Sequence, residues 1–219
     1  MRLVTFGCSQ TFGHALPDVW DYKNKQPITD QGPSKHAWPQ LLADKLNLEC
    51  CNFGLSGAGN KEIWWNAINY DFKKTDIVIV LWSVLNRYCI IKNSPTYSET
   101  QSFSPFDKNL EAVNFYKYLH NDFDMISDFY IRCNHLHSFL NNKIKLINHG
   151  ILDHTLRHKI YKVHNADYRV KFNKILFLTT FFPDIKKNCP AALDNSHPGL
   201  EAHTQFAEEI YNEIKNEIT

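Results

Sequence analysis

A continuous apolar run at Ile77–Trp82 constrains the fold of this chain more than any other feature. A strand with water on one face alternates apolar and polar residues, so an unbroken run predicts a strand covered on both faces, as in parallel sheets. Further strands are predicted at 2–6, 48–53 and 143–148, and helices at 38–46, 60–72, 110–140 and 198–218. This alternation predicts an α/β fold, a three-layer sandwich in which helices flank a central, mostly parallel sheet.

The chain has 219 residues, a length that suits one sizeable domain. We expect a single domain over 1–219, with a variable insertion around 92–140. The polar stretch 92–109 is expected to be a loop, and Asn60 is expected to cap the helix that follows it in the chain. Residues 150–192 fit either strand or buried helix, so their assignment stays open.

Composition excludes several classes of function. The formal net charge is +1, which argues against a nucleic-acid partner. No apolar run is long enough for a membrane span, and the N-terminus lacks the apolar stretch of a secretory signal. The six cysteines form no CxxC pair, so reduced thiols and a cytoplasmic location are expected. No cofactor or metal is expected, because His154 and His158 have the spacing of a zinc pair but no third ligand in clear register.

Polar and glycine-rich segments follow three of the predicted strands, at 7–11, 54–60 and 82–87. Ligands of parallel sheets bind at the carboxyl ends of the strands, so these segments are candidate site loops. Near the other end of the chain, Asp194 and His197 precede the last helix. A histidine held by a carboxylate can serve as general base for a hydroxyl, which Ser9 would supply. Alternatively, Asp194 caps the helix and His197 is a surface residue.

Three blocks occur in one order: "FGCSQTFG", "NFGLSGAGN" and "DNSHPG". Together they resemble the SGNH hydrolase family, also called GDSL esterases, over nearly the whole chain. The sequence around these blocks resembles a phage-associated or marine bacterial branch of that family. The resemblance implies a flavodoxin-like architecture with Ser9 as nucleophile, His197 as base and Asp194 as its orienting carboxylate. It also implies an oxyanion hole formed by the N–H groups of Ser9 and Gly57.

Two positions depart from the family pattern. The aspartate usual before the serine is Cys8 here, and we interpret this thiol as packed behind the loop. The family also has a Gly-x-Asn-Asp block after its third strand. Here the chain reads "LWSVLNRY" at that place, and Asn86 is either the third oxyanion donor or a turn residue. Trp82, Ser83 and Arg87 are the candidates for lining a substrate pocket.

The sequence therefore predicts a serine esterase that hydrolyses a small acyl ester through an acyl-enzyme on Ser9. A carbohydrate O-acetyl ester is the expected substrate within the family's range. Two alternatives stay open: a non-catalytic glycan-binding or virion accessory module on the same fold, and an O-acyltransferase that uses the same acyl-enzyme. Fold alone does not decide among them. The oligomeric state is open as well.

Overall fold

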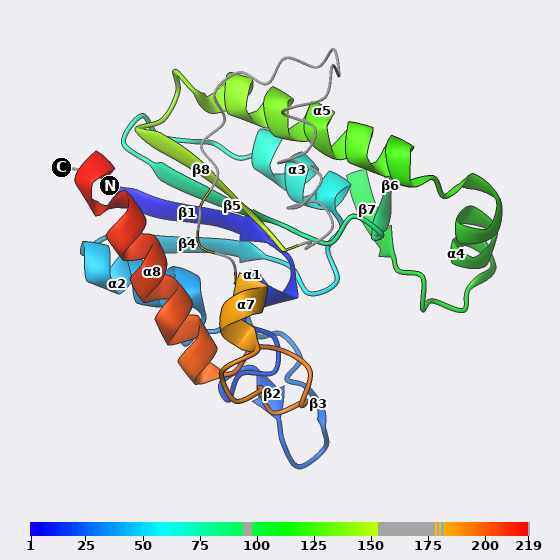
Figure 1. Cartoon of the computed structure of the whole chain (residues 1–219), viewed down its shortest axis with the longest axis horizontal. Coiled ribbons are helices and arrows are strands. Elements are labelled where there is room, and N and C mark those ends of the chain that lie inside the picture. Colours follow the sequence, from blue (N-terminus) through cyan, green and yellow to red (C-terminus); the bar gives the residue numbers. More distant parts are fainter. Residues whose placement is uncertain (94–97, 153–177, 179, 181, 219) are drawn as a thin grey trace.

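A four-stranded parallel sheet forms the centre of the molecule (Figure 1). The computed structural model describes residues 1–93, 98–152, 178, 180 and 182–218. The strands run in the spatial order β4 (Glu49–Gly54), β1 (Arg2–Gly7), β5 (Ile77–Trp82) and β8 (Leu146–Ile151). Every residue of β5 is buried, as its unbroken apolar run predicts.

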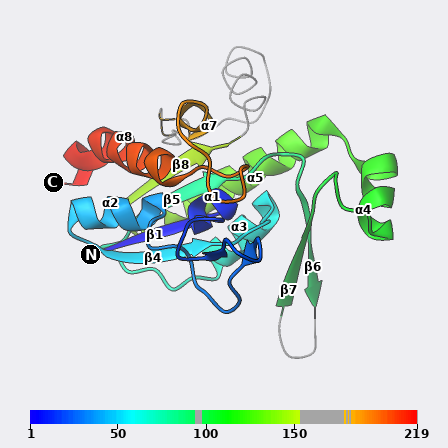
Figure 2. The same ribbon diagram turned by 90° about the horizontal axis from the view of Figure 1, so that it is seen from below.

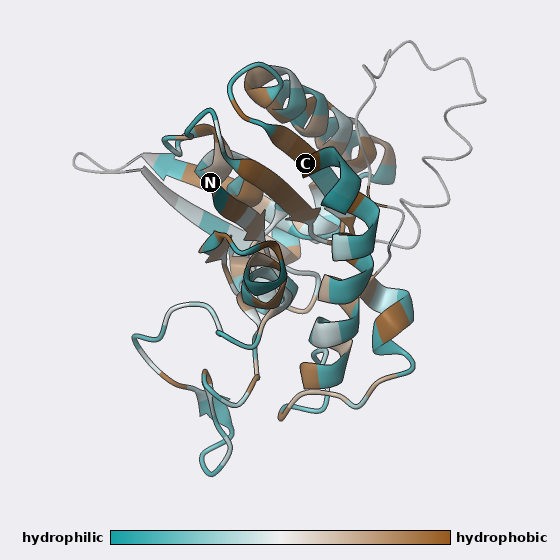
Figure 3. Cartoon of the chain, turned by 90° about the vertical axis from the view of Figure 1, so that its left-hand side faces the viewer, coloured by the Kyte–Doolittle hydropathy of each residue, from teal (hydrophilic) through white to brown (hydrophobic). Residues whose placement is uncertain are grey.

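Helices cover both faces of this sheet, which confirms the predicted three-layer sandwich (Figures 1 and 2). One face carries α2 (Trp38–Leu46) and α8 (Leu200–Ile218), which pack on each other through an edge-to-face pair of Trp38 and Phe206. The other face carries α3 (Asn60–Ile68) and α5 (Asp122–Leu140). Figure 3 shows the apolar residues concentrated in the strands between these layers.

The strand register aligns the three candidate site loops at one edge of the sheet. Gly7, the last residue of β1, pairs with Gly54 of β4 and with Leu81 of β5. The short helix α1 (Ser9–Phe12) and the segments after β4 and β5 therefore begin side by side. At the opposite edge, Arg2 makes a two-pronged ion pair with the buried Asp76, with N–O distances of 2.9 and 2.7 Å.

The prediction of a loop over 92–109 is wrong in its first half. Residues Tyr88–Asn93 and Ser98–Phe103 pair as an antiparallel hairpin, β6–β7, which projects beside the sheet (Figure 2). Its polar strand β7 is held by long-range contacts: Thr100 and Ser102 both donate to the carboxylate of Glu62 on α3. These hydrogen bonds hold β7 in place although it lacks the apolar residues by which a strand is usually predicted.

The predicted helix 110–140 is broken once. It divides into α4 (Leu110–Asn114), the π-helical turn η1 (Phe115–Leu119) and α5. The break falls where the side chain of Asn121 accepts hydrogen bonds from the N–H groups of Phe123 and Asp124 and so caps α5. One face of α5 is buried in the hydrophobic core, and the variable insertion expected around 92–140 stays a prediction.

The remaining short elements lie near the site edge or beside the last helix. These are β2 (Trp20–Asp21), β3 (Gln26–Pro27) and α7 (Phe182–Lys186). His154, His158 and most of the ambiguous stretch 150–192 lie outside the described residues. None of the described helices combines the length and the apolar composition that crossing a membrane requires.

Candidate active site

The structure brings Ser9, His197 and Asp194 into one hydrogen-bonded line. Ser9 opens α1 directly after β1, and His197 lies in the turn before α8, 188 residues away. The Nε2 atom of His197 is 3.1 Å from Ser9 Oγ, and its Nδ1 atom is 2.5 Å from Asp194 Oδ2. A hydroxyl, an imidazole and a carboxylate in this order form the arrangement of a catalytic triad.

Asp194 is committed to orienting the histidine. Its carboxylate accepts hydrogen bonds from the N–H groups of Ser196 and His197, from Ser196 Oγ and from His197 Nδ1. Burial alone would raise the pKa of Asp194, but these hydrogen bonds outweigh burial and hold the pKa well below its usual range. The alternative of a helix cap with a surface histidine does not describe this geometry, because the imidazole of His197 points at Ser9.

The triad residues Asp194 and His197 also form part of a candidate cation site. His14, Asp194 and His197 offer ligand atoms that lie within 4.8 Å of one another. The oxygens of Asp194 already accept four hydrogen bonds, and Nε2 of His197 faces a hydroxyl. These commitments favour proton transfer over metal binding at this place.

Cys8 and Ser9 have different surroundings although they are neighbours. The side chain of Cys8 is buried in the main hydrophobic core, and its carbonyl accepts the N–H groups of Thr11 and Phe12. Ser9 is the one of the two whose side chain reaches His197. The interpretation of Cys8 as a packed residue agrees with this placement.

The loop after β4 presents Gly57 beside α1. Gly57 has a φ of +88°, a conformation that residues with a Cβ rarely adopt. Gly54 lets this loop approach α1, because a Cβ there would lie 2.3 Å from the N atom of Phe12. The side chain of Asn52 links the two segments: it accepts the N–H of Gly54 and donates to the carbonyl of Thr11.

Asn60 joins this loop to the segment after β5, a role that the sequence analysis missed. It does not cap α3; Gly59 holds that position. Instead, its amide accepts the N–H of Ser83 at 2.8 Å and donates to the Ser83 carbonyl at 3.2 Å. Arg87 adds a second link, because its guanidinium donates to the carbonyl of Ala58 and to Ser83 Oγ. Together, Asn60 and Arg87 fix the spacing between the loop after β4 and the segment after β5.

The predicted pocket and oxyanion residues fall in three different environments. Trp82 is fully buried, and its indole stacks on His149 and packs edge-on to Phe129, so its assignment to a substrate pocket is wrong. Ser83 is buried at the end of β5. Asn86 has an exposed side chain, and its carbonyl lies 2.6 Å from the hydroxyl of Tyr116. Its part in an oxyanion hole stays a prediction.

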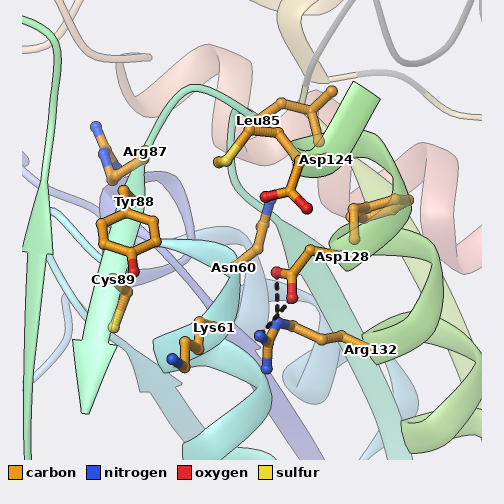
Figure 4. A pocket seen from close by; sticks show the side chains of 11 residues that line it. Asn60, Lys61, Leu85, Arg87, Tyr88, Cys89, Asp124, Asp128 and Arg132 are labelled. Carbon is orange, nitrogen blue, oxygen red and sulfur yellow. Dashed lines mark hydrogen bonds and ion pairs between the residues drawn. The ribbon is translucent and has the colours of Figure 1, made fainter. Parts of the chain in front are cut away.

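Arg87 also borders a cavity of about 200 Å³ between α3, β6 and α5 (Figure 4). Asn60 and Tyr88 line the same cavity, together with the bidentate ion pair of Arg132 and Asp128. Figure 4 shows Asp128 and Arg132, both on α5, paired with each other at one side of this space. Ser9, Asp194 and His197 do not line this cavity, so it is separate from the candidate catalytic residues.

Two further residues at the site were missed because no motif marks them. His14 follows α1, and its Nδ1 atom lies 2.9 Å from the hydroxyl of Ser56, the neighbour of Gly57. The ring of His14 packs on that of His197 with 4.6 Å between centroids. The only hint in the sequence is position, since both residues fall within the quoted site blocks or directly beside them.

Comparison with solved structures places this fold among known ones. A protein from Desulfitobacterium hafniense described as a G-D-S-L family lipolytic protein matches with a TM-score of 0.52 and 15% identity, over 96% of this chain and 98% of the other. An acetyl xylan esterase from Butyrivibrio proteoclasticus matches with a TM-score of 0.51 and 17% identity over 99% of this chain. A carbohydrate esterase family 2 enzyme from Corynascus matches with a TM-score of 0.58 and 11% identity, also over 99% of this chain.

This chain spans 64% and 66% of the last two proteins, which are longer. No protein-family model and no curated protein matches the sequence. At these identities the likeness concerns the fold. It confirms the architecture that the resemblance to SGNH hydrolases implied.

Proposed function

We propose that this chain, which has the fold of the SGNH hydrolases, is a serine esterase that hydrolyses small acyl esters. The observation that carries the proposal is the hydrogen-bonded line from Ser9 Oγ through the His197 ring to Asp194. A non-catalytic binding module has no need for this alignment, which joins segments 188 residues apart. The proposal therefore assigns the line to catalysis.

The first step is acylation of Ser9. His197 Nε2 accepts the proton of Ser9 Oγ as this oxygen attacks the ester carbonyl. The imidazolium that forms is stabilised by Asp194, whose hydrogen bond also selects the tautomer with a proton on Nδ1. The same proton then passes from Nε2 to the departing alcohol oxygen. In the second step, His197 removes a proton from water, which attacks the acyl-enzyme. The bond between the acyl carbon and Ser9 Oγ then breaks, and His197 returns the proton to Ser9 Oγ, which frees the acid and the serine.

Backbone N–H groups stabilise the oxyanion in this proposal. The N–H groups of Ser9 and Gly57 have no hydrogen-bond acceptor among the described residues, and they lie on segments that Asn52 holds together. Each such donor typically lowers the barrier by about 3 kcal/mol. Asn86 is proposed as the third donor, from its exposed side chain in the segment after β5.

The acyl group is proposed to be acetyl, and the alcohol to be a carbohydrate. The support is the likeness in fold to an acetyl xylan esterase, together with the polar side chains of Ser56 and His14 beside the triad. No cofactor takes part in the proposed steps. All six cysteines are free thiols, which fits the proposal of a reducing, cytoplasmic location.

The experiment is a comparison of wild type, Ser9→Ala and Cys8→Ala. A fluorophosphonate probe should label wild type and Cys8→Ala, while Ser9→Ala should lose both labelling and release of acetate from an acetylated xylooligosaccharide. Cys8→Ala is the matched control, because it removes the adjacent nucleophile from the same turn. Labelling that follows Cys8 instead of Ser9 would overturn the assignment. Transfer of acetate to an added sugar without release of free acetate would favour an acyltransferase.

A further inference from the structure

His14 is held in a fixed orientation beside the triad. Its Nδ1 atom is engaged by Ser56 Oγ at 2.9 Å, and Trp20 contacts the ring edge-on with 5.2 Å between centroids. The residue is half-buried, and its Nε2 atom has no hydrogen-bond partner within the described part of the chain. One ring nitrogen is therefore anchored, and the other is available to a ligand.

The contact of His14 with His197 indicates which part of a bound substrate would lie next to His14. In the proposed reaction, His197 Nε2 passes a proton to the departing alcohol, so the alcohol oxygen must come within hydrogen-bond reach of that ring. His14 packs on the same ring, with 4.6 Å between centroids. His14 therefore lies close to the place that the departing alcohol must reach.

The chemistry of His14 suits a hydroxyl group. Burial lowers the pKa of His14, and the adjacent His197 lowers it further, which favours the neutral ring. A neutral imidazole can donate or accept at Nε2, depending on the tautomer. The hydroxyl of Ser56 can act as donor or acceptor toward Nδ1, so both tautomers are compatible with the anchor.

We propose that His14, anchored by Ser56, forms an alcohol subsite that hydrogen-bonds a free hydroxyl next to the ester oxygen of the substrate. The inference rests on the proposed esterase function and adds the group that recognises the alcohol, through a hydroxyl next to the ester oxygen as sugars carry it. Trp20 packs edge-on against the ring of His14 and limits its movement. His14 is thus a specificity-determining residue, and the proton transfers themselves belong to His197.

The test compares two acetates with the same acyl group. One is a monoacetylated methyl glycoside with a free hydroxyl beside the acetyl group, and the other is ethyl acetate, which has none. His14→Phe keeps a ring and removes both ring nitrogens, so kcat/KM for the glycoside should fall about tenfold while that for ethyl acetate changes less than threefold. His14→Gln, which places an amide near the position of Nε2, should recover part of the loss. His36→Ala, an exposed histidine of the following loop, is the control.

A binding measurement separates this inference from the proposed function. Titration of Ser9→Ala with the acetylated glycoside should show binding that weakens about tenfold in Ser9→Ala/His14→Phe. If wild type hydrolyses neither ester, the esterase proposal fails, and the titration alone decides whether the subsite exists. Equal losses on both esters, unchanged rates on the glycoside, or glycoside binding that is absent or indifferent to His14 would each overturn the subsite.

Discussion

His197 Nε2 lies 3.1 Å from Ser9 Oγ, and the contact depends on elements from both ends of the chain. Strand β1 delivers Ser9 to the carboxyl edge of the sheet. The turn that holds His197 is placed by the packing of α8 on α2, which Trp38 and Phe206 anchor. The fold thus assembles one hydrogen-bonded line from segments near the two ends of the chain.

This line makes the tautomer of His197 testable. Asp194→Asn should lower kcat by about 10³–10⁴-fold, because an amide can hold the ring in the tautomer that lacks a lone pair toward Ser9. His197→Ala should cost at least as much, because it removes the base. Steady-state hydrolysis of the acetylated glycoside, with circular dichroism to confirm folding, measures both effects. Near wild-type turnover by His197→Ala would remove the triad from consideration.

The sequence predicted the elements whose determinants are local. The helix at Trp38–Leu46 has the predicted bounds, because its apolar spacing and the proline in its first turn both lie within the segment. Strand β5 was found for a similar reason, since burial on both faces leaves an unbroken apolar run. The order of the three site blocks placed Ser9, Asp194 and His197 in one hypothesis, which their distances support.

Features that depend on distant partners could not be predicted. Strand β7 is stabilised by Glu62 across 38 and 40 residues, and its polar composition resembles a loop. Trp82 has the position of a pocket residue, but packing against His149 and Phe129 buries it. The contact of His14 with Ser56 spans 42 residues and follows from strand order, which single residues do not reveal.

Removal of one partner of the Arg2–Asp76 ion pair should be strongly destabilising. Burial opposes ionisation of Asp76, but hydrogen bonds from Arg2 and the N–H of Lys73 outweigh it, so its pKa lies below the ordinary value. Asp76→Asn leaves Arg2 without its partner at the start of β1 and should lower the free energy of unfolding by about 3 kcal/mol. Urea denaturation measures this. Asp184→Asn, in an exposed pair with Lys187, should cost far less.

The buried histidines predict acid sensitivity. Burial lowers the pKa of His203 to about 3, and its Nδ1 accepts the N–H of Trp38. The pKa of His149 is also lowered to about 3 by burial. The unfolded chain, with the ordinary pKa of about 6.5, therefore binds more protons between pH 6.5 and 3. Stability is complete above about pH 6.5 and falls with decreasing pH, by roughly 1 kcal/mol per pH unit for each histidine.

Urea midpoints at pH 7.5, 6.5 and 5.5 test this dependence. His203→Asn keeps an acceptor for the N–H of Trp38 and removes the titrating ring, so the slope between pH 6.5 and 5.5 should become shallower. His36→Ala, which removes an exposed histidine, is the matched control. A slope that is the same in His203→Asn and wild type would show that His203 does not titrate in the expected window.

Mutation can test whether Asn86 is the third oxyanion donor. Asn86 is exposed, and Tyr116 holds its main chain through the carbonyl, so Asn86→Ala should fold normally. If its side chain donates to the oxyanion, acylation by the acetylated glycoside should slow roughly a hundredfold. Nitrophenyl acetate has a better leaving group, so its rate should fall less, because its transition state depends less on the third donor.

Ser83→Ala is the informative counterpart, since Ser83 lies in the same segment after β5 and its Oγ accepts a hydrogen bond from Arg87. A hundredfold loss in Ser83→Ala with unchanged rates in Asn86→Ala would move the donor to Ser83. Unchanged rates in both would leave a hole of two backbone donors, from Ser9 and Gly57.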